Sequence, residues 1–216
     1  MSMLKKALTI AGVILLLQST STAEQVLSFV DAAASSGLSG PLKGIMAHAA
    51  ACGDIDGDGD LDLYVGNFCD RPPERYLGRS GPVPNMLLIN EGDRFRESGQ
   101  QTVVMKARTS GAVMVDLDND GDLDLYVSNN SKKKGLRLEN KLFENINGRF
   151  RDVSKGNAAC IVMGGRSVGV LDFDGDGLLD LLVTEDKWTG GRTRLFRNLG
   201  KLRFDDASSR VGLPNN

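Results

Sequence analysis

The chain has 216 residues, of which 41% are hydrophobic and 25% are charged. This is the composition of a folded globular protein with a core, and it argues against a disordered chain. Fourteen of the 28 acidic residues lie in three nine-residue segments, which we call the first, second and third loops: residues 54–62, 116–124 and 172–180. The mildly acidic pI of about 5.5 therefore comes from three short segments, and the rest of the chain is basic.

The first 23 residues predict a signal peptide. Lys5 and Lys6 precede an apolar stretch, Ala7–Leu17, and small residues follow at Ser21–Ala23. A membrane anchor is the alternative, but eleven apolar residues fall short of the ~20 that span a bilayer. We expect an exported protein, periplasmic, extracellular or on the cell surface, with no membrane span after cleavage. Residues 24–216 then form the mature repeat domain, and export argues against a nucleic-acid partner.

Three cysteines follow, at Cys52, Cys69 and Cys160. Export permits disulfides, but this spacing fits no metal-binding template. Because Cys52 and Cys160 stand in short apolar stretches, we expect buried free thiols. A disulfide between Cys52 and Cys69 is the alternative.

The three loops belong to a longer repeat. They begin 62 and then 56 residues apart, each after small or β-branched residues and before a strand-like run, LYVGN, LYVSN or LLVTE. Downstream, NMLLINEGDRF, NKLFENINGRF and TRLFRNLGKLRF each predict a β-hairpin around a glycine turn. Each unit thus holds four strands, and the repeats cover approximately residues 40–98, 99–153 and 154–207.

This pattern predicts an all-β fold of propeller-type blades, each with four antiparallel strands. Three repeats make a partial or open propeller, since closed rings need about 4–8 blades. The phenylalanine strand of the repeat is expected once more near the start, in SFVDAAASSGLSG from Ser28. Three explanations stay open: a fragment of a longer protein, an open arc that closes by self-association through its edges, or a leading segment that pairs with an edge strand.

Each loop follows the pattern DxDxDGxxD, which predicts a calcium site. Aspartates at positions 1, 3, 5 and 9 and the carbonyl of position 7 supply oxygen ligands, and the glycine at position 6 permits a tight turn. The predicted metal ligands, one Ca²⁺ per loop and about three in all, are Asp54, Asp56, Asp58, Asp60 and Asp62; Asp116, Asp118, Asp120, Asp122 and Asp124; and Asp172, Asp174, Asp176, Leu178 and Asp180.

Other interpretations of the loops are weaker. An EF-hand needs a glutamate at position 12, where this chain has Val65, Val127 and Val183. Magnesium prefers octahedral sites that keep several waters. Plain Asp-Gly turns without an ion are disfavoured by three copies in register.

The segment DLDNDGDLDLYVSN and its downstream NKLFENINGRFRDV resemble the FG-GAP or VCBS-like repeat of integrin α-subunit propellers and of many exported bacterial proteins. The resemblance covers about residues 28–214. It implies loops between blade strands that bind calcium structurally, at the positions given above. Leu178 departs from the aspartate at position 7 of the other loops, and Gly111–Val113 is the nearest approach to a literal Gly-Ala-Pro.

No catalytic constellation is recognised. His48 is the single histidine, no GxSxG frames a serine, and the loop carboxylates are assigned to metal. We therefore expect a module for extracellular binding or adhesion rather than an enzyme, with His48 as a turn or packing residue. The alternative is part of an exported polysaccharide-active enzyme, a lyase or hydrolase, or its carbohydrate-binding portion.

Basic residues gather in the connections between the second and third strands of the repeats. If these connections share one face, they predict a patch that binds an extracellular protein or an acidic polysaccharide. An ordinary solvated surface of mixed charge is the alternative. The patch would contain Arg71, Arg75 and Arg79; Lys132, Lys133, Lys134 and Arg137; and Lys187, Arg192 and Arg194, with Tyr76 and Trp188 beside them.

Overall fold

The computed structural model describes residues 28–130, 138–186 and 192–213. The expected signal peptide, residues 1–23, lies outside these ranges. The chain divides into two units, Met1–Ala32 and Ala33–Asn216, and every strand belongs to the second unit. None of the helices in the described ranges has the length and apolar character to span a bilayer.

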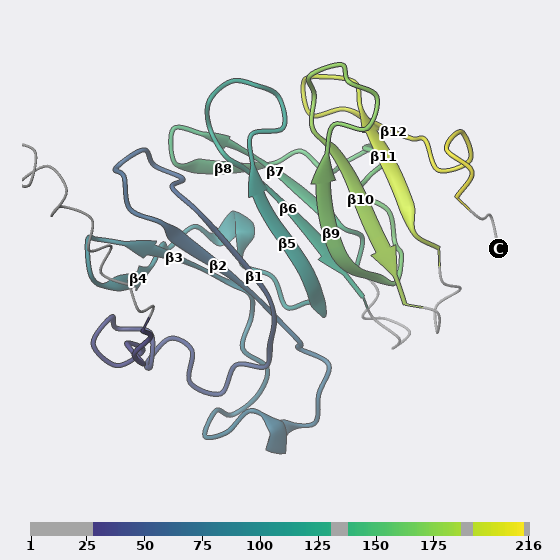
Figure 1. The fold of residues 1–216 in the computed structure, drawn as a ribbon. Helices are drawn as coiled ribbons and strands as arrows, with labels where there is room; N and C mark the ends of the chain where they lie inside the picture. The colour runs from purple at the N-terminus through teal and green to yellow at the C-terminus, as the bar shows by residue number, and fades with distance from the viewer. Residues whose placement is uncertain (1–27, 131–137, 187–191, 214–216) are drawn as a thin grey trace, which may run out of the picture. The chain divides into compact units, whose positions relative to one another are not determined.

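The fold is all-β, as predicted: three antiparallel sheets of four strands, each sheet built from one contiguous segment (Figure 1). The first sheet contains β1 (Ala47–Gly53), β2 (Asp62–Asn67), β3 (Met86–Asn90) and β4 (Phe95–Glu97). The second contains β5 (Thr109–Val115), β6 (Asp124–Asn129), β7 (Lys141–Ile146) and β8 (Arg149–Asp152). The third contains β9 (Gly165–Leu171), β10 (Asp180–Glu185), β11 (Arg194–Asn198) and β12 (Phe204–Asp206).

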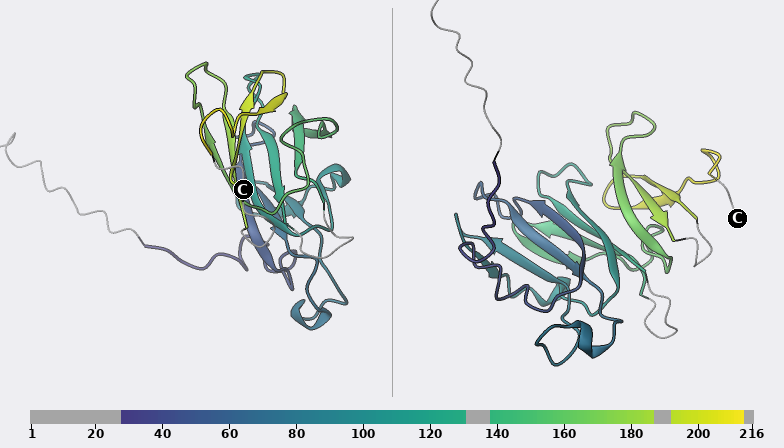
Figure 2. Two further views of the ribbon diagram at one scale, coloured as in Figure 1. Left: turned by 90° about the vertical axis from the view of Figure 1, so that its right-hand side faces the viewer. Right: turned by 60° about the horizontal axis from the view of Figure 1, so that its bottom comes forward.

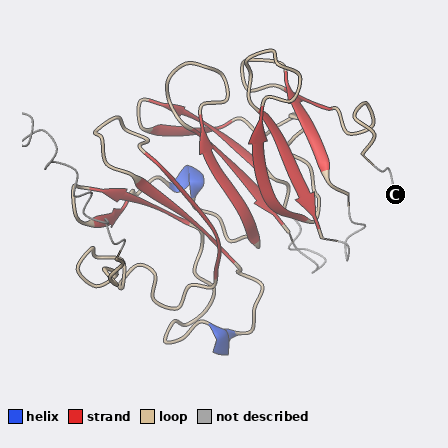
Figure 3. Cartoon of the chain, in the orientation of Figure 1, coloured by secondary structure: helices blue, strands red, loops and turns tan. Residues whose placement is uncertain are grey.

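In every sheet the strands lie in chain order, which is the arrangement of open propeller-type blades. The only helical segments in the described ranges are two short 3₁₀ turns, η1 (Pro73–Arg75) and η2 (Gln101–Val103) (Figure 3).

The core consists of apolar layers between successive sheets. Figure 2 shows the ribbon of these sheets from two further directions. Tyr64 and Leu87 of the first sheet share one buried cluster with Leu125, Val127 and Phe143 of the second. A corresponding cluster joins the second and third sheets. Side chains of a strand alternate between the two faces, so a strand packed on both sides must be apolar nearly throughout. This explains the runs LYV of β2 and β6, whose side chains enter apolar clusters on both faces of their sheets.

Small residues in the first strand of each sheet have a packing reason. β1 contacts β5, and β5 contacts β9. At the second of these contacts, a Cβ atom added to Gly111 would lie only 2.6 Å from the carbonyl oxygen of Arg166. A side chain at Gly111 would therefore push the two sheets apart.

The leading segment corrects one prediction. No strand forms near Ser28; residues 33–44 are turns, and Gly37 adopts a left-handed φ of 79° that bends the chain. The carbonyl of Ser36 nevertheless accepts a hydrogen bond from the Phe95 amide at 2.8 Å. Leu38, Leu42 and Ile45 pack against the apolar cluster on that face of the first sheet. This segment thus covers an edge strand, but with a turn and apolar side chains instead of a paired strand.

The cysteines are all free, so the disulfide alternative is not seen. Cys160 is buried as expected, and burial raises the pKa of its thiol to about 12. Burial likewise raises the pKa of Cys69 to about 11. Cys52, predicted to be buried, is exposed. The alternation of β1 explains this, because Ala51 faces the core and its neighbour Cys52 therefore faces the other way.

Candidate metal-binding loops

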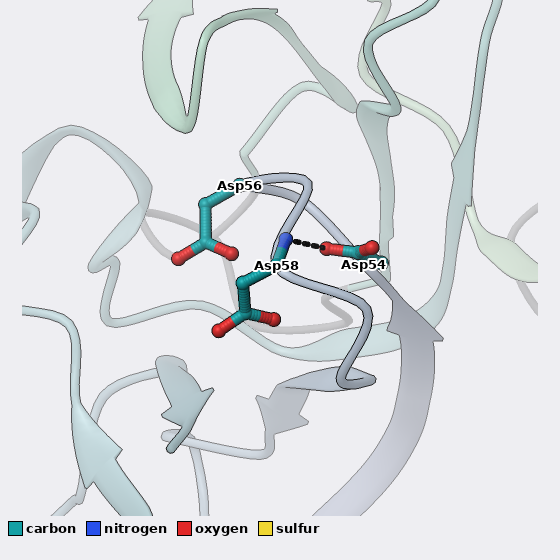
Figure 4. Close-up of side chains that lie close together, drawn as sticks. All are labelled: Asp54, Asp56 and Asp58. Atoms are coloured by element: carbon teal, nitrogen blue, oxygen red, sulfur yellow. Dashed lines mark hydrogen bonds between the residues drawn. The ribbon is translucent and has the colours of Figure 1, made fainter. Parts of the chain in front are cut away.

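The three loops occupy the same place in each sheet, between its first and second strands. The glycine at position 6 is left-handed in each, with φ of 94° at Gly59, 98° at Gly121 and 84° at Gly177. A side chain is disfavoured in this conformation, which is why the pattern requires glycine there. Figure 4 shows the resulting turn of the first loop, with Asp54, Asp56 and Asp58 around it.

The aspartate at position 1 holds the turn together. The two carboxylate oxygens of Asp54 accept hydrogen bonds from the amides of Gly57 at 2.8 Å, Asp58 at 3.2 Å and Gly59 at 2.9 Å. Asp172 does the same in the third loop, and Asp116 accepts from the last two of the equivalent amides in the second. Each loop backbone is thus preorganised by its own first residue.

The aspartate at position 9 is the buried anchor of each loop. Asp62, Asp124 and Asp180 are at most 1% exposed. One carboxylate oxygen of Asp124 accepts from the amide of Leu117 in the loop, and the other accepts from the amide of Asn145 in β7. The same pair of bonds recurs at Asp62 and Asp180. Position 9, predicted as a bidentate metal ligand, also ties the loop to the third strand of its sheet.

Burial raises the pKa of the position 9 carboxyl in two loops. For Asp124 the pKa rises to about 7, because burial disfavours the charged form more than the two amide hydrogen bonds favour it. The pKa of Asp62 is also raised, again mainly by burial. A positive charge beside these carboxylates would offset the cost of keeping them ionised.

The structure brings carboxylates of each loop together in groups that fit a metal ion. Within each group, one oxygen from every residue lies within 4.8 Å of the others. The groups are Asp54, Asp56 and Asp58; Asp116, Asp118 and Asp124; and Asp172, Asp174 and Asp180. The position 5 aspartates, Asp120 and Asp176, fall outside the second and third groups, and the position 9 aspartate, Asp62, falls outside the first. In all three loops the position 5 carboxylate accepts a hydrogen bond from the amide at position 7.

The second loop contains a buried carboxylate oxygen without a hydrogen-bond partner. Oδ1 of Asp118 is buried and has no hydrogen-bond partner. The pKa of Asp118 is raised, first by burial and then by the carboxylates of Asp120 and Asp116. Oxygen donors crowded in this way suit a hard cation such as Ca²⁺, so the residues present fit the ion.

Position 7 has a role that the sequence did not reveal. Oδ2 of Asp122 accepts a hydrogen bond at 2.7 Å from the amide of Asn147, in the turn between β7 and β8. The side chains of Asp60 and Leu178 likewise lie close to the glycines of the corresponding hairpin turns, Gly92 and Gly200. The side chain at position 7 therefore faces the hairpin, and only its backbone carbonyl stays a predicted ligand.

The third strand of each sheet contains an asparagine at the same position, Asn90, Asn145 or Asn198. The residue before this asparagine differs among the sheets: it is Ile89 in β3, Glu144 in β7 and Arg197 in β11. Arg197 forms ion pairs with Asp174 at 2.5 Å and with Asp176 at 2.8 Å. Glu144 lies near enough to Asp118 to help raise the pKa of that carboxyl, although it also pairs with Arg151. Aligning the three hairpin segments by eye would have revealed this difference.

A groove opens beside the second loop, with a volume of about 710 Å³. Its lining includes Asp118, Arg151 and Lys155 on one side and Lys201 and Arg203 on the other. The equivalent groove beside Asp56 has only about 260 Å³. There Gln100 crosses between two sheets, donating to the Gly148 carbonyl at 2.8 Å and accepting from the Phe150 amide at 3.0 Å.

The predicted basic patch is only partly described. Arg71 and Arg75 are exposed, but Arg79 donates to the carbonyls of Gly40 and Lys43 and thus holds the leading segment. Arg194 pairs with Asp206 at 2.7 Å. Five members lie outside the described residues, namely Lys132, Lys133, Lys134, Arg137 and Lys187, as does Trp188.

His48 is a packing residue. Its ring stacks on Phe68 with centroids 3.5 Å apart, and the guanidinium of Arg108 lies over Phe68 at 3.8 Å. Arg108 in turn pairs with buried Asp70 at 2.8 Å. The pKa of His48 is lowered, first by burial and then by Arg108. The chain has one histidine, and these packing contacts explain its presence without invoking catalysis.

Comparison with known proteins supports the same repeat. Residues 73–127 match the FG-GAP-like repeat family, and residues 164–194 match the FG-GAP repeat family. Cartilage acidic protein 1 of Homo sapiens is 30% identical over 179 residues, which are 79% of this chain and 24% of that protein. The Mus musculus protein of the same name is 29% identical over 79% of this chain and 25% of its own length. The chain thus spans about a quarter of the length of these relatives.

Proposed function

Because the chain belongs to the FG-GAP repeat family, we propose that it is an exported, calcium-binding repeat module for extracellular binding or adhesion, in which calcium is structural. The observation that carries this proposal is that three aspartate carboxylates, with oxygens within 4.8 Å of one another, come together in the same loop of all three sheets. They belong to positions 1, 3 and 5 in the first loop and to positions 1, 3 and 9 in the other two. The buried and unpartnered Oδ1 of Asp118 supports it further.

The loop residues divide the work of holding an ion. Position 1 fixes the turn, position 3 supplies a carboxylate from the loop, and buried position 9 connects the site to the third strand of the sheet. The ion, when bound, would supply the positive charge that lets these carboxylates stay ionised together. Binding would therefore fasten the connection between two strands of each blade.

Thermal unfolding with and without chelator tests this proposal. We expect EDTA to lower the melting temperature strongly and added Ca²⁺, but not an equal concentration of Mg²⁺, to restore it. At a free Ca²⁺ concentration of 100 times the Kd of a site, binding at that site adds about 2.7 kcal/mol to the free energy of unfolding. EDTA already saturated with Ca²⁺ is the control. An unchanged melting temperature in EDTA contradicts the proposal.

Export rests on the sequence of residues 1–23 and is tested by the mature N-terminus. We expect the protein expressed with these residues in a secreting host to be recovered outside the cytoplasm and to begin near Glu24 by mass spectrometry. An uncleaved, membrane-bound product would favour the N-terminal anchor instead.

A second proposal concerns the ligand. The groove beside the second loop has Arg151, Lys155, Lys201 and Arg203 in its lining, against two acidic residues. Lys155 stands five residues after Phe150, as Gln100 stands five residues after Phe95, so this groove has a lysine at the sequence position of the glutamine that crosses the other groove. An open groove with an excess of cations suits an acidic polysaccharide, whose carboxylates recur along the chain.

Calorimetry with oligogalacturonate, and with dextran as the neutral control, tests this second proposal. We expect salt-sensitive binding of oligogalacturonate that Lys155→Glu abolishes and Arg210→Glu preserves, since Arg210 is an exposed residue that pairs with Asp205 outside the groove. Equal binding by both variants contradicts the proposal that the groove is the binding site. Release of new reducing ends or unsaturated sugars would instead support the polysaccharide-active enzyme.

A further inference from the structure

We propose that Arg197 supplies the third loop with a built-in cation, so that the chain binds two calcium ions tightly, in its first and second loops, and a third one weakly or not at all. This inference rests on the proposed calcium binding and refines it. It also replaces the expectation of three equivalent sites, one for each loop.

The guanidinium of Arg197 bridges the two carboxylates that the third loop would offer from positions 3 and 5. Its Nε lies 2.5 Å from Oδ2 of Asp174, and its Nη2 lies 2.8 Å from Oδ2 of Asp176. Among the described residues, no ion pair reaches a carboxylate of the first or second loop. The third loop alone thus has an internal partner for its negative charge.

The position of Arg197 follows from the strand register. The next residue, Asn198, donates its amide to Asp180 at 2.7 Å, as Asn90 does to Asp62 and Asn145 to Asp124. The residue before this asparagine therefore stands at the same place beside each loop. It is neutral Ile89 at the first loop, acidic Glu144 at the second and basic Arg197 at the third.

The charge of this residue should make the calcium affinity differ among the three loops. Calcium binds carboxylate oxygens at about 2.3–2.6 Å, and Arg197 already pairs with Asp174, a member of the third carboxylate group. An ion in the third loop must therefore displace the guanidinium or share the Asp174 carboxylate with it. Arginine keeps its charge at every pH at which the protein is folded, and its planar fork matches carboxylates well. The side chain is 30% exposed, so solvent screens part of the repulsion. We expect calcium affinity at the third loop at least about tenfold below that of the other two.

Calorimetric titration of the metal-free full chain with Ca²⁺ alone counts the sites. We expect two tight sites in the unmodified protein and three in Arg197→Gln. Arg197→Lys keeps the charge and should stay at two, although its weaker fit will raise the affinity of the third loop somewhat. Arg210→Gln, which breaks an exposed ion pair of the same sheet, is the matched control and should also stay at two.

A second pair of variants makes the test independent of substitutions at Arg197. Asp118→Asn should lower the number of tight sites from two to one. Asp174→Asn, at the same position of the third loop, should leave it at two. Far-ultraviolet circular dichroism of each metal-free variant checks that the sheets are intact.

The outcomes separate this inference from the proposed function. Three tight sites in the unmodified protein, or loss of a tight site in Asp174→Asn, overturn the role of Arg197 and leave calcium binding in place. Absence of any calcium binding in the unmodified protein and in Arg197→Gln overturns the proposed function itself.

Discussion

The side-chain amide of Asn145, in β7, donates a hydrogen bond at 2.8 Å to the backbone carbonyl of Ile55 in the first loop. Asn198, in β11, makes the same bond at 2.6 Å to Leu117 in the second loop. Each of these loops is therefore held by the sheet that follows it in the chain. We therefore expect metal binding at a loop to be coupled to the packing between two sheets through this bond.

Asn145→Ala should lower both the free energy of unfolding and the calcium affinity of the first loop. Ile55 is 2% exposed, so its carbonyl would lose its partner without access to water, at a cost of about 1–3 kcal/mol. Urea unfolding in Ca²⁺ and in EDTA measures both effects. Asn90→Ala is the matched control, because Asn90 stands at the same register of the first sheet but, among the described residues, its side chain makes no such bond to a loop carbonyl. Equal losses in the two variants would show that the bond to Ile55 is not the cause.

Asp122→Ala should weaken the hairpin of the second sheet while leaving calcium bound. The variant removes the acceptor for the Asn147 amide, a loss of about 1 kcal/mol. If position 7 ligates only through its carbonyl, calorimetry should give an unchanged calcium affinity within about threefold. Asp118→Ala is the contrast, since it should abolish tight binding at this loop. A similar loss of binding in Asp122→Ala would make its side chain a ligand.

The repeat was accessible from the sequence because three copies could be aligned. The apolar runs, the turn glycines and the aspartate frame each recur in register, and together they predict both the four-stranded sheets and the carboxylate groups. The leading segment shows where this method fails. The segment from residue 28 to 40 resembles the repeat in sequence, yet Gly37 turns the chain, and the Ser36 carbonyl accepts a hydrogen bond from Phe95 of the neighbouring edge strand without a strand forming there. A segment that resembles the repeat in sequence still needs a neighbouring strand to pair with before it forms a strand.

Features that depend on contacts between sheets were not predictable in the same way. The bonds from Asn145 to Ile55 and from Asn198 to Leu117 join residues 90 and 81 positions apart. Arg197 was not predictable from the common pattern, because the repeats agree at the aspartates and differ at this position, which holds Ile89, Glu144 or Arg197. Residues that differ among the three repeats at equivalent positions therefore indicate how one loop differs from another.

Cys52 should be the one cysteine that reacts rapidly in the native protein. It is exposed, whereas burial raises the pKa of Cys69 to about 11 and that of Cys160 to about 12. The thiolate is the form that attacks the reagent, so half-buried Cys69 and buried Cys160 should both react slowly at pH 8. Titration with Ellman's reagent should give about one fast thiol per chain, rising to three in denaturant, and none that is fast in Cys52→Ser. Two fast thiols in the native state would contradict the packing around Cys69.

The cluster around His48 should make stability fall as the pH drops below about 6.5. The pKa of His48 is lowered in the folded protein, mainly by burial and by Arg108, so the unfolded chain binds a proton more readily. This contribution is fully present above the unfolded pKa and is lost as the pH falls through the folded one. Many carboxylates also titrate in acid, so the test compares the pH dependence of stability in two proteins. His48→Gln should show a weaker loss of stability between pH 7.5 and 5.5 than the unmodified protein, by urea unfolding in the same buffers. Parallel curves for the two proteins would mean that His48 does not titrate with a lowered pKa.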